Sequence, residues 1–288
     1  HAGPIQSAAY LTARAGFHPL VSMSWGSDLM LEAGRNFLTR LTTRYALACT
    51  DVLVGDCACV GEKAKSFSFD IGNYFQFPWG VDLNHFSPIG SAELRNNLGW
   101  QDKFVLLSTR SFESLYGVDT LIDAFIAAAG QNPDLRLIML GKGSLEGAIH
   151  QKIMERGLRD KVHFGGQASL TELPDIYRSS DLYISASHSD GSSVSLMEAL
   201  ASGLPALVSD IPGNREWVKQ GEQGWLFKVG NTEELTNQIL DVFTKKNDLV
   251  RMKKDNRELA EVRADWDKNF PVLLMAYEKA VAMAGSHA

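Results

Sequence analysis

The chain has 288 residues, a length that suggests about two domains and is ample for a buried hydrophobic core. Its composition is 45% hydrophobic and 22% charged, which excludes a disordered or collagen-like chain. The formal net charge of −6 disfavours nonspecific binding to nucleic acids, and no apolar run approaches the ~18 residues that a membrane-spanning helix needs.

The three cysteines, Cys49, Cys57 and Cys59, are odd in number, and none of their spacings is the C-x2-C of a tetrahedral zinc site. We therefore expect reduced thiols that pack in the interior of a cytoplasmic protein. The chain begins with His1 instead of methionine, and we expect it to be a processed or excised part of a longer protein.

The first 88 residues alternate short apolar runs with segments of helical periodicity. The pattern predicts strands at 20–24, 52–54 and 74–77 and helices near 5–14, 36–49 and 57–66. Three strands make a small sheet for a nucleotide-binding domain, so we interpret residues 1–88 as part of one. Glycine and proline residues predict a linker at 79–99.

From about residue 104 the alternation is more regular, and the apolar runs are nearly continuous. Such runs are typical of parallel strands that helices cover on both faces. This pattern predicts an α/β fold with a doubly wound sheet. The predicted strands are 104–108, 135–140, 162–164, 182–185, 206–209 and 225–228, and the predicted helices include 118–129, 145–156 and 232–245.

A last helix is predicted at 266–283. The residues of the helical face that we expect to be buried are Trp266, Phe270, Leu273, Leu274, Tyr277 and Val281. The triplet Asp265-Trp266-Asp267 is the only Asp-x-Asp sequence in the chain. Because acidic residues at the start of a helix interact favourably with its dipole, we expect capping there and no metal site.

A polar, glycine-containing turn follows the strand that is predicted to end at Ser185, and a helix is predicted to begin near Val194. Free backbone N–H groups at such a helix start can bind an anion. Glu198, about one turn into the helix, could accept hydrogen bonds from a ribose diol, and Asp190 in the turn could bind sugar hydroxyls. Taken alone, the two could equally be a solvated helix residue and a turn cap.

The run from Asp190 to Pro205 reads DGSSVSLMEALASGLP. An acidic residue followed eight positions later by Glu198 in this setting resembles the signature of the retaining glycosyltransferases of family 4, also called group 1. Further blocks agree with that family in order and spacing: Gly80-Val81-Asp82, Gly117-Val118-Asp119, Leu140-Gly141-Lys142-Gly143 and Gly224-Trp225-Leu226-Phe227.

The resemblance implies a GT-B fold of two Rossmann-like domains. Residues 1–88 would be a truncated N-terminal, acceptor-side domain, residues 89–265 would bind the donor, and a helix at 266–288 would cross back to the N-terminal domain. The implied reaction moves a sugar from a nucleoside diphosphate sugar to an acceptor hydroxyl with retention of anomeric configuration. The nucleotide sugar is then a co-substrate, and we expect no metal and no other cofactor.

The resemblance also implies roles for single residues. Arg110, at the end of a predicted strand, would stabilise the leaving diphosphate; the less favoured alternative is a surface arginine on a loop. Asp190 would orient the donor sugar, and Glu198 would hold the ribose. Gly166 and Gln167 match a loop that holds the nucleobase through backbone groups. The phosphate-binding turn and helix start would be Gly191, Ser192, Ser193, Val194 and Ser195.

The sequence departs from the family pattern at several positions. Tyr116 stands where the family has lysine, so Lys142 could supply the missing cation or be an ordinary turn residue. Asp190 replaces the usual glutamate and shortens the reach to the sugar. Trp25 replaces a histidine and could stack on a sugar or be packing between domains. Asp28 could orient an acceptor hydroxyl or cap a helix.

The implied partners are the nucleotide sugar and a sugar, polysaccharide or lipid-linked acceptor, with no nucleic acid. Arg35, Arg40 and Arg44 could face a membrane, but their spacing is also typical of a solvated helix face. Two alternative functions remain open: a sugar-nucleotide epimerase on the same fold, and a non-catalytic remnant that binds a sugar nucleotide.

Overall fold

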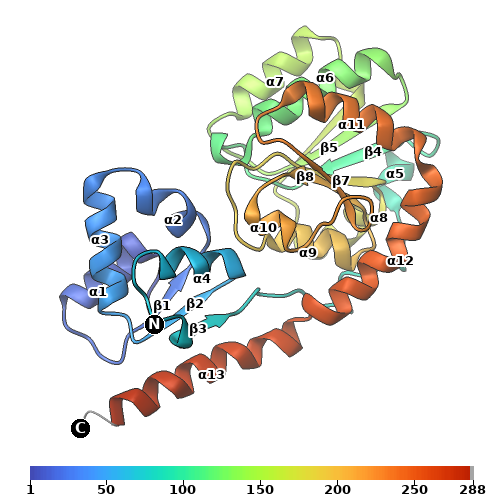
Figure 1. Cartoon of the computed structure of the whole chain (residues 1–288). Helices are drawn as coiled ribbons and strands as arrows, with labels where there is room; N and C mark the ends of the chain where they lie inside the picture. Colours follow the sequence, from blue (N-terminus) through green and yellow to red (C-terminus); the bar gives the residue numbers. More distant parts are fainter. Residues whose placement is uncertain (286–288) are drawn as a thin grey trace. The chain divides into compact units, whose positions relative to one another are not determined.

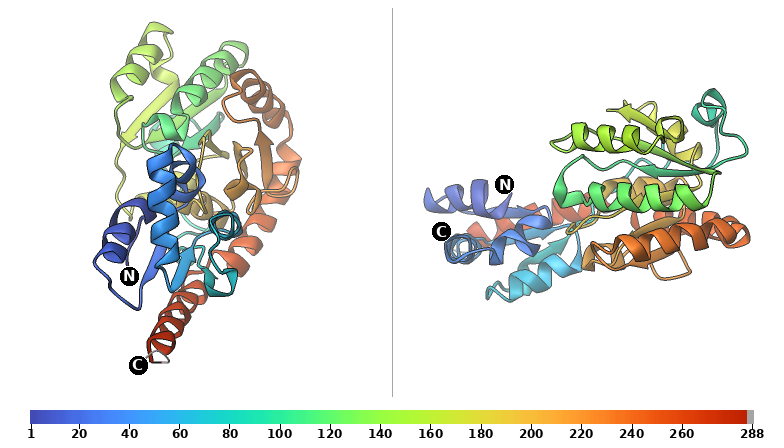
Figure 2. Two further views of the ribbon diagram at one scale, coloured as in Figure 1. Left: turned by 60° about the vertical axis from the view of Figure 1, so that its left-hand side comes forward. Right: turned by 90° about the horizontal axis from the view of Figure 1, so that it is seen from above.

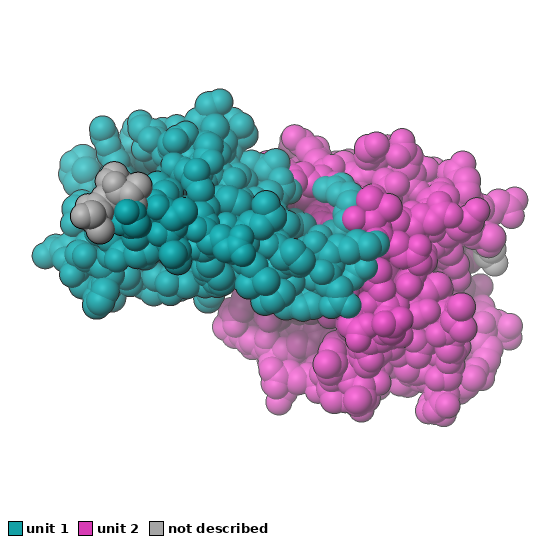
Figure 3. All heavy atoms as spheres, turned by 90° about the horizontal axis from the view of Figure 1, so that it is seen from below, with its two compact units in different colours: residues 1–80, 189–193, 263–288 teal, residues 81–188, 194–262 magenta. Residues whose placement is uncertain are grey.

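A computed structural model of the chain (Figures 1 and 2) describes residues 1–285, which form two compact units (Figure 3). The first unit comprises residues 1–80, residues 189–193 and the residues from 263 onward, and the second comprises 81–188 and 194–262. The sequence predicted boundaries at residues 88 and 265. The structure instead ends the first stretch at Gly80 and assigns the turn at 189–193 to the first unit.

The first unit contains a parallel sheet in the order β1 (Val21–Ser24), β2 (Val52–Gly55), β3 (Tyr74–Gln76). The predicted strands agree with these to within one residue. The first predicted helix is divided into a π-helix and a short α-helix. The helical elements are η1 (Ile5–Ala9), α1 (Tyr10–Arg14), α2 (Ser27–Met30), η2 (Glu32–Gly34), α3 (Phe37–Ala48), α4 (Ala58–Lys65), η3 (Ile71–Asn73) and α13 (Trp266–Gly285).

Both faces of this sheet are covered, because successive side chains of a strand point to opposite faces. Leu53 of β2 packs in a core with Ile5 of η1 and Leu47 of α3. Its neighbours Val52 and Val54 belong to a separate core that α13 completes. The sheet is therefore buried on both sides, as its apolar strands require.

Helix α13 buries a narrower face than the sequence predicted. Its buried residues are Leu273, Ala276 and Ala280, whose small alanine side chains let the helix approach the sheet closely. The prediction that the other large apolar residues of this face are buried is wrong for four of them, which are exposed: Trp266, Phe270, Leu274 and Val281. Asp265 caps the helix as expected, because its Oδ1 accepts a hydrogen bond from Asp267 N at 3.1 Å.

The second unit contains a six-stranded parallel sheet in the order β6-β5-β4-β7-β8-β9. This is the order of a doubly wound α/β sheet, which confirms the predicted fold class. Each predicted strand is confirmed to within two residues at either end. The strands are β4 (Phe104–Ser108), β5 (Leu135–Leu140), β6 (Val162–Gly166), β7 (Leu182–Ser185), β8 (Ala206–Ser209) and β9 (Gly224–Phe227).

The helices of this unit include several that the sequence did not predict. One of them, α5, lies inside the stretch that was expected to be an irregular linker. The helical elements are α5 (Glu93–Asn97), η4 (Ser114–Tyr116), α6 (Val118–Gln131), α7 (Glu146–Glu155), η5 (Arg159–Lys161), α8 (Leu173–Arg178), α9 (Val194–Ala201), α10 (Pro212–Arg215), α11 (Thr232–Thr244) and α12 (Lys246–Arg263), which ends at the boundary.

Helix α12 has a polar residue in the middle of its buried face, which hides the helical periodicity. Leu249, Met252 and Ala260 are buried at helical spacing, and Asn256 lies between them with no exposed surface. Its Nδ2 donates to the carbonyl oxygens of Leu204 at 3.1 Å and of residue 223 at 3.0 Å. Within residues 1–285, no helix is long and apolar enough to cross a membrane.

Candidate functional site

The two central strands of the second sheet, β4 and β7, lie side by side. After β4 the chain continues to β5 on one side of this pair, and after β7 it continues to β8 on the other side. In doubly wound sheets, ligands bind at the carboxyl ends of the strands at such a point. Gly117, the N-cap of α6, contacts Ala186 here, since an added Cβ would lie 2.1 Å from the Ala186 carbonyl oxygen. The loops after the two strands are therefore in direct contact.

Arg110 follows β4, and its half-buried guanidinium is held by neighbouring side chains. Its Nη1 donates to Ser195 Oγ at 3.2 Å, and its Cζ lies 4.2 Å from the centre of the Tyr116 ring. Ser195 Oγ is also 2.8 Å from the Tyr183 hydroxyl. The structure thus brings together three predicted site residues, Arg110, Tyr116 and Ser195, and fixes the direction of the guanidinium.

Glu198 lies on α9, which begins at Val194 as predicted. Its Oε2 accepts a hydrogen bond from the Tyr177 hydroxyl at 2.7 Å. Burial raises the pKa of Glu198, against the Tyr177 hydrogen bond and the charge of His85, which lower it. Glu198 is therefore not a solvated helix residue. Tyr177 was not predicted from the sequence, although a fully buried tyrosine needs a hydrogen-bond partner.

The turn after β5 contains Lys142 and packs against the loop of Arg110. Phe112 N donates to Lys142 O at 3.0 Å, and an added Cβ on Gly141 would lie 2.8 Å from Arg110 O. Gly141 N donates to Gly166 O at 2.6 Å, so the end of β6 lies beside the same turn. Lys142, whose side chain is exposed, therefore lies in a turn whose backbone contacts the loop that contains Arg110.

A pocket of about 560 Å³ opens at the ends of β5 and β6. Its lining includes Leu140, Gly165 and the exposed Gln167, together with Asp175 and Arg178 of α8. This volume is in the range of small-molecule sites. Gln167 is thus a predicted site residue that lines this pocket.

The turn that carries Asp190 packs within the first unit. Gly191 N donates to Asp190 Oδ1 at 3.0 Å, Ser192 N donates to Asp56 Oδ2 at 3.0 Å, and Ser193 is buried. The expectation that the amides of this turn are free to bind an anion was therefore wrong for Gly191 and Ser192. The reason is Asp56, which the sequence analysis did not single out. Its position directly after β2 is the signal that could have identified it.

Asp56 is 4% exposed, and burial raises the pKa of its carboxyl group from 3.8 to about 7. The Ser192 amide lowers this pKa and the negative charge of Asp190 raises it. The carboxylate is also closely packed, since an added Cβ on Gly191 would lie 2.1 Å from Asp56 Oδ2. Asp56 is therefore protonated in a large fraction of molecules near neutral pH.

We expect the melting temperature to fall between pH 5 and pH 8, because the folded state binds more protons than the unfolded state between pH 3.8 and about 7. Asp56→Asn should remove most of this fall and raise the melting temperature at pH 8 by several degrees. Calorimetry across this range, with the exposed Asp70→Asn as a matched control in the same unit, checks the result. An unchanged pH dependence in Asp56→Asn would contradict the raised pKa.

Trp25 and Asp28 follow β1 but differ in their surroundings. The Trp25 side chain is 54% exposed, which leaves its ring accessible. Asp28 is buried: its Oδ2 accepts from Ile5 N at 3.0 Å, and its Oδ1 accepts from Ser24 Oγ at 2.6 Å. Asp28 therefore organises the loop after β1.

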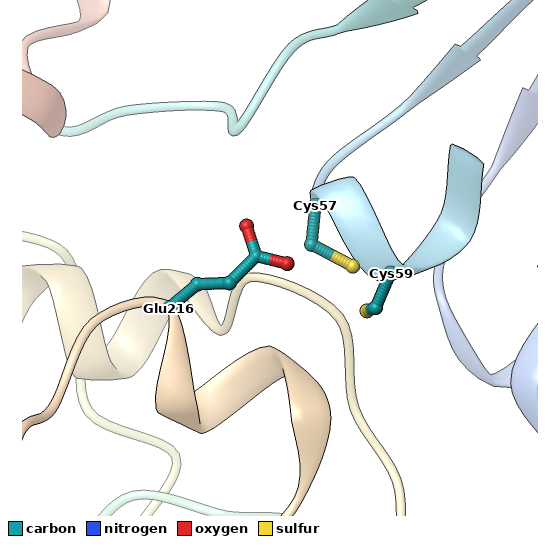
Figure 4. Close-up of side chains that lie close together, drawn as sticks. All are labelled: Cys57, Cys59 and Glu216. Carbon is teal, nitrogen blue, oxygen red and sulfur yellow. The ribbon is translucent and has the colours of Figure 1, made fainter. Parts of the chain in front are cut away.

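The cysteines are free thiols, and two of them lie at the start of α4 (Figure 4). The sulfur atoms of Cys57 and Cys59 are within 4.8 Å of each other, and their hydrogen bond together with burial raises the pKa of the Cys57 thiol. Glu216, also drawn in Figure 4, follows α10 in the second unit. Two thiols in one unit are fewer than the four ligands of a structural zinc site.

Comparison with known proteins identifies the family. The family model of the glycosyl transferases group 1 matches residues 91–259. The UDP-N-acetylglucosamine–peptide N-acetylglucosaminyltransferase GtfA subunit of Streptococcus gordonii is 36% identical over 130 residues, which are 45% of this chain and 25% of that protein. The mannosylfructose-phosphate synthase of Agrobacterium fabrum is 33% identical over 170 residues, 55% of this chain and 35% of that protein. The chain thus matches about a quarter to a third of the length of these relatives.

Among solved structures, Anabaena Alr3699/HepE in complex with UDP matches 97% of this chain and 77% of that chain, with a TM-score of 0.80 and 21% identity. This likeness shows a common fold, the GT-B type of α/β fold with parallel sheets. The family model covers more than half of the chain. The chain therefore belongs to the family of glycosyl transferases group 1.

Proposed function

We propose that this protein is a retaining glycosyltransferase, which moves a sugar from a nucleoside diphosphate sugar to an acceptor hydroxyl. The observation that carries the proposal is the pair of Arg110 and Glu198 beside the switch point of the second sheet, linked through Ser195 and Tyr177. An oriented guanidinium is suited to a diphosphate, and a carboxylate with one oxygen held by Tyr177 is suited to ribose hydroxyls.

In the proposed reaction, the bond between the anomeric carbon and the diphosphate oxygen breaks while the acceptor oxygen bonds to the same face of the sugar. The departing diphosphate oxygen takes the acceptor proton. Arg110 stabilises the charge that develops on the diphosphate, and Lys142 adds a second cation from the adjacent turn. These two cations replace a metal ion. Asp190 orients the donor sugar, and the backbone at Gly166 and Gln167 holds the base.

A uridine diphosphate sugar is the donor that we propose to test first. The Streptococcus gordonii relative is named for UDP-N-acetylglucosamine, and the Anabaena structure contains UDP. For the acceptor we propose a sugar, polysaccharide or lipid-linked hydroxyl, with the exposed Trp25 ring as a stacking surface. The free thiols fit a reducing compartment, and we propose the cytoplasm.

The test is calorimetric titration with UDP, GDP and ADP and their sugar conjugates. We expect one nucleotide to bind, and Glu198→Gln to weaken its binding about tenfold or more because a charged hydrogen-bond acceptor is lost. The matched control is Glu155→Gln, which changes an exposed glutamate of α7 in the same unit and should leave binding unchanged. If none of the nucleotides bound, the proposed donor site would be wrong.

Product analysis by NMR then separates the candidate functions. A glycoside with the anomeric configuration of the donor, formed also in the presence of EDTA, supports a retaining reaction without a metal. An isomerised donor would indicate an epimerase instead. Nucleotide binding with no product from any sugar acceptor would favour the non-catalytic remnant.

A further inference from the structure

Near the start of the second unit, His85 lies in a turn at residues 82–86 whose backbone is held from two directions along the chain. Asp82 closes the turn from within, because its Oδ1 accepts a hydrogen bond from His85 N at 3.2 Å. Arg257 of α12 binds the end of the turn, because its Nη1 donates to Phe86 O at 2.7 Å. The backbone that carries the His85 side chain is therefore fixed within this unit.

The His85 side chain reaches a second segment, the loop at residues 167–172 that connects β6 to α8. Its Nε2 lies 2.8 Å from Leu170 O. A carbonyl oxygen only accepts hydrogen bonds, so Nε2 carries a proton and donates it. Within residues 1–285, no other hydrogen bond joins this loop to a segment beyond the loop itself and α8. His85 therefore makes the polar link between the loop and the rest of the unit.

This loop contributes to the lining of the pocket at the ends of β5 and β6. Its shape is set internally, because Glu172 Oε2 accepts hydrogen bonds from Ser169 N at 2.8 Å and from Ser169 Oγ at 2.6 Å. These internal bonds close the loop but do not tie it to the strands, whereas the bond from His85 does tie it to a fixed turn. The loop residues that line the pocket are Gln167, Ala168, Thr171 and Glu172.

The turn at 82–86 also contacts the residues around Glu198. Phe86 is 3% exposed, and its ring centre lies 5.0 Å from that of His85 and 5.9 Å from that of Tyr177, edge to face in both cases. Tyr177 in turn donates its hydroxyl proton to Glu198. Burial raises the pKa of Glu198 and the charge of His85 lowers it, so the imidazole is near enough for its charge to act on this carboxylate. The turn thus contacts both the pocket loop and the partner of Glu198.

We propose that His85 is a positioning residue for the nucleobase of the donor. Its Nε2–H group ties the loop at 167–172 to a fixed turn, so the backbone at Gln167 is ordered before the base arrives. A loop that is already ordered binds more tightly, because the entropy of ordering it does not reduce the affinity. This inference rests on the proposed function and goes beyond it, since it assigns part of the affinity for the base to a side chain outside the pocket lining.

The test is calorimetric titration of His85 variants with the nucleotide that the unmodified chain binds. His85→Leu removes the donor and should weaken binding about threefold to tenfold, the range expected for one hydrogen bond. His85→Gln keeps an N–H donor at the end of the side chain and should restore most of the affinity. The matched control, Asn84→Leu, changes the exposed neighbouring residue and should bind as the unmodified chain does.

Two further measurements separate positioning from general damage to the fold. Inorganic pyrophosphate has no base, so its affinity should be the same for His85→Leu and the unmodified chain. Hydrogen exchange without any ligand should be faster at residues 167–172 in His85→Leu than in Asn84→Leu.

The outcomes distinguish this proposal from the donor site itself. If His85→Leu bound the nucleotide as tightly as the unmodified chain, or lost affinity for pyrophosphate to the same extent, the positioning role would be wrong and the donor site would stand. If the unmodified chain bound no nucleotide, the proposed donor site would be wrong, and the role of His85 with it.

Discussion

Replacement of Arg110 by alanine should lower kcat about 100-fold to 1,000-fold and change the KM for the donor much less. The guanidinium is held by Ser195 and by the ring of Tyr116, so it is oriented before the reaction begins. A fixed cation interacts more strongly with the charge that develops on a departing diphosphate than with the ground state. Steady-state kinetics with the nucleotide sugar identified by titration measure both constants.

Two variants serve as controls for this experiment. Arg110→Lys keeps the charge but loses the planar group that stacks on Tyr116, so its kcat should lie between those of the unmodified enzyme and Arg110→Ala. Arg156→Ala removes an exposed arginine from the same unit and should have no effect. If Arg110→Ala raised the KM and left kcat unchanged, Arg110 would contribute only to ground-state binding, and its proposed role in the transition state would be wrong.

The strands of this fold could be predicted from the sequence more closely than the helices. β4 and β5 agree with the prediction at both ends, because strands buried on both faces are almost continuously apolar. Helices are recognised by one face of large apolar residues. This signal fails where the buried face contains a polar residue or consists mainly of small side chains. Asn256 interrupts the buried face of α12, and Ala276 and Ala280 contact the sheet where larger side chains of α13 remain exposed.

The candidate site likewise contains some features that the sequence predicts and others that it does not. Arg110 and Glu198 could be predicted because a strand end and a helix start are short-range features of the sequence. The hydrogen bonds of Tyr177 and Asp56 could not, because each is made with a partner far along the chain. Tyr177 is 21 positions from Glu198, and Asp56 is 136 positions from Ser192. Single-sequence periodicity contains no information on such pairs, which only the folded backbone brings together.

Gly117→Ala should lower the free energy of unfolding of the second unit by more than about 3 kcal/mol, from strain and steric overlap together. Gly117 has φ of +57°, a left-handed conformation that costs about 1 to 2 kcal/mol for a residue with a Cβ. The added Cβ would also lie 2.1 Å from the Ala186 carbonyl oxygen, which is backbone and cannot rotate away. Urea unfolding followed by circular dichroism measures the change.

Gly157→Ala separates the two causes of this loss. Gly157 has nearly the same φ, +64°, but an added Cβ there has no atom within 4 Å, so only the conformational strain of about 1 kcal/mol should appear. The difference between the two variants therefore measures the close approach of the loops that follow β4 and β7. Equal losses would mean that these loops separate at little cost. Arg110 lies in the loop after β4 and bonds Ser195 at the start of α9, which follows the loop after β7, so Gly117→Ala should also weaken nucleotide binding, whereas Gly157→Ala should not.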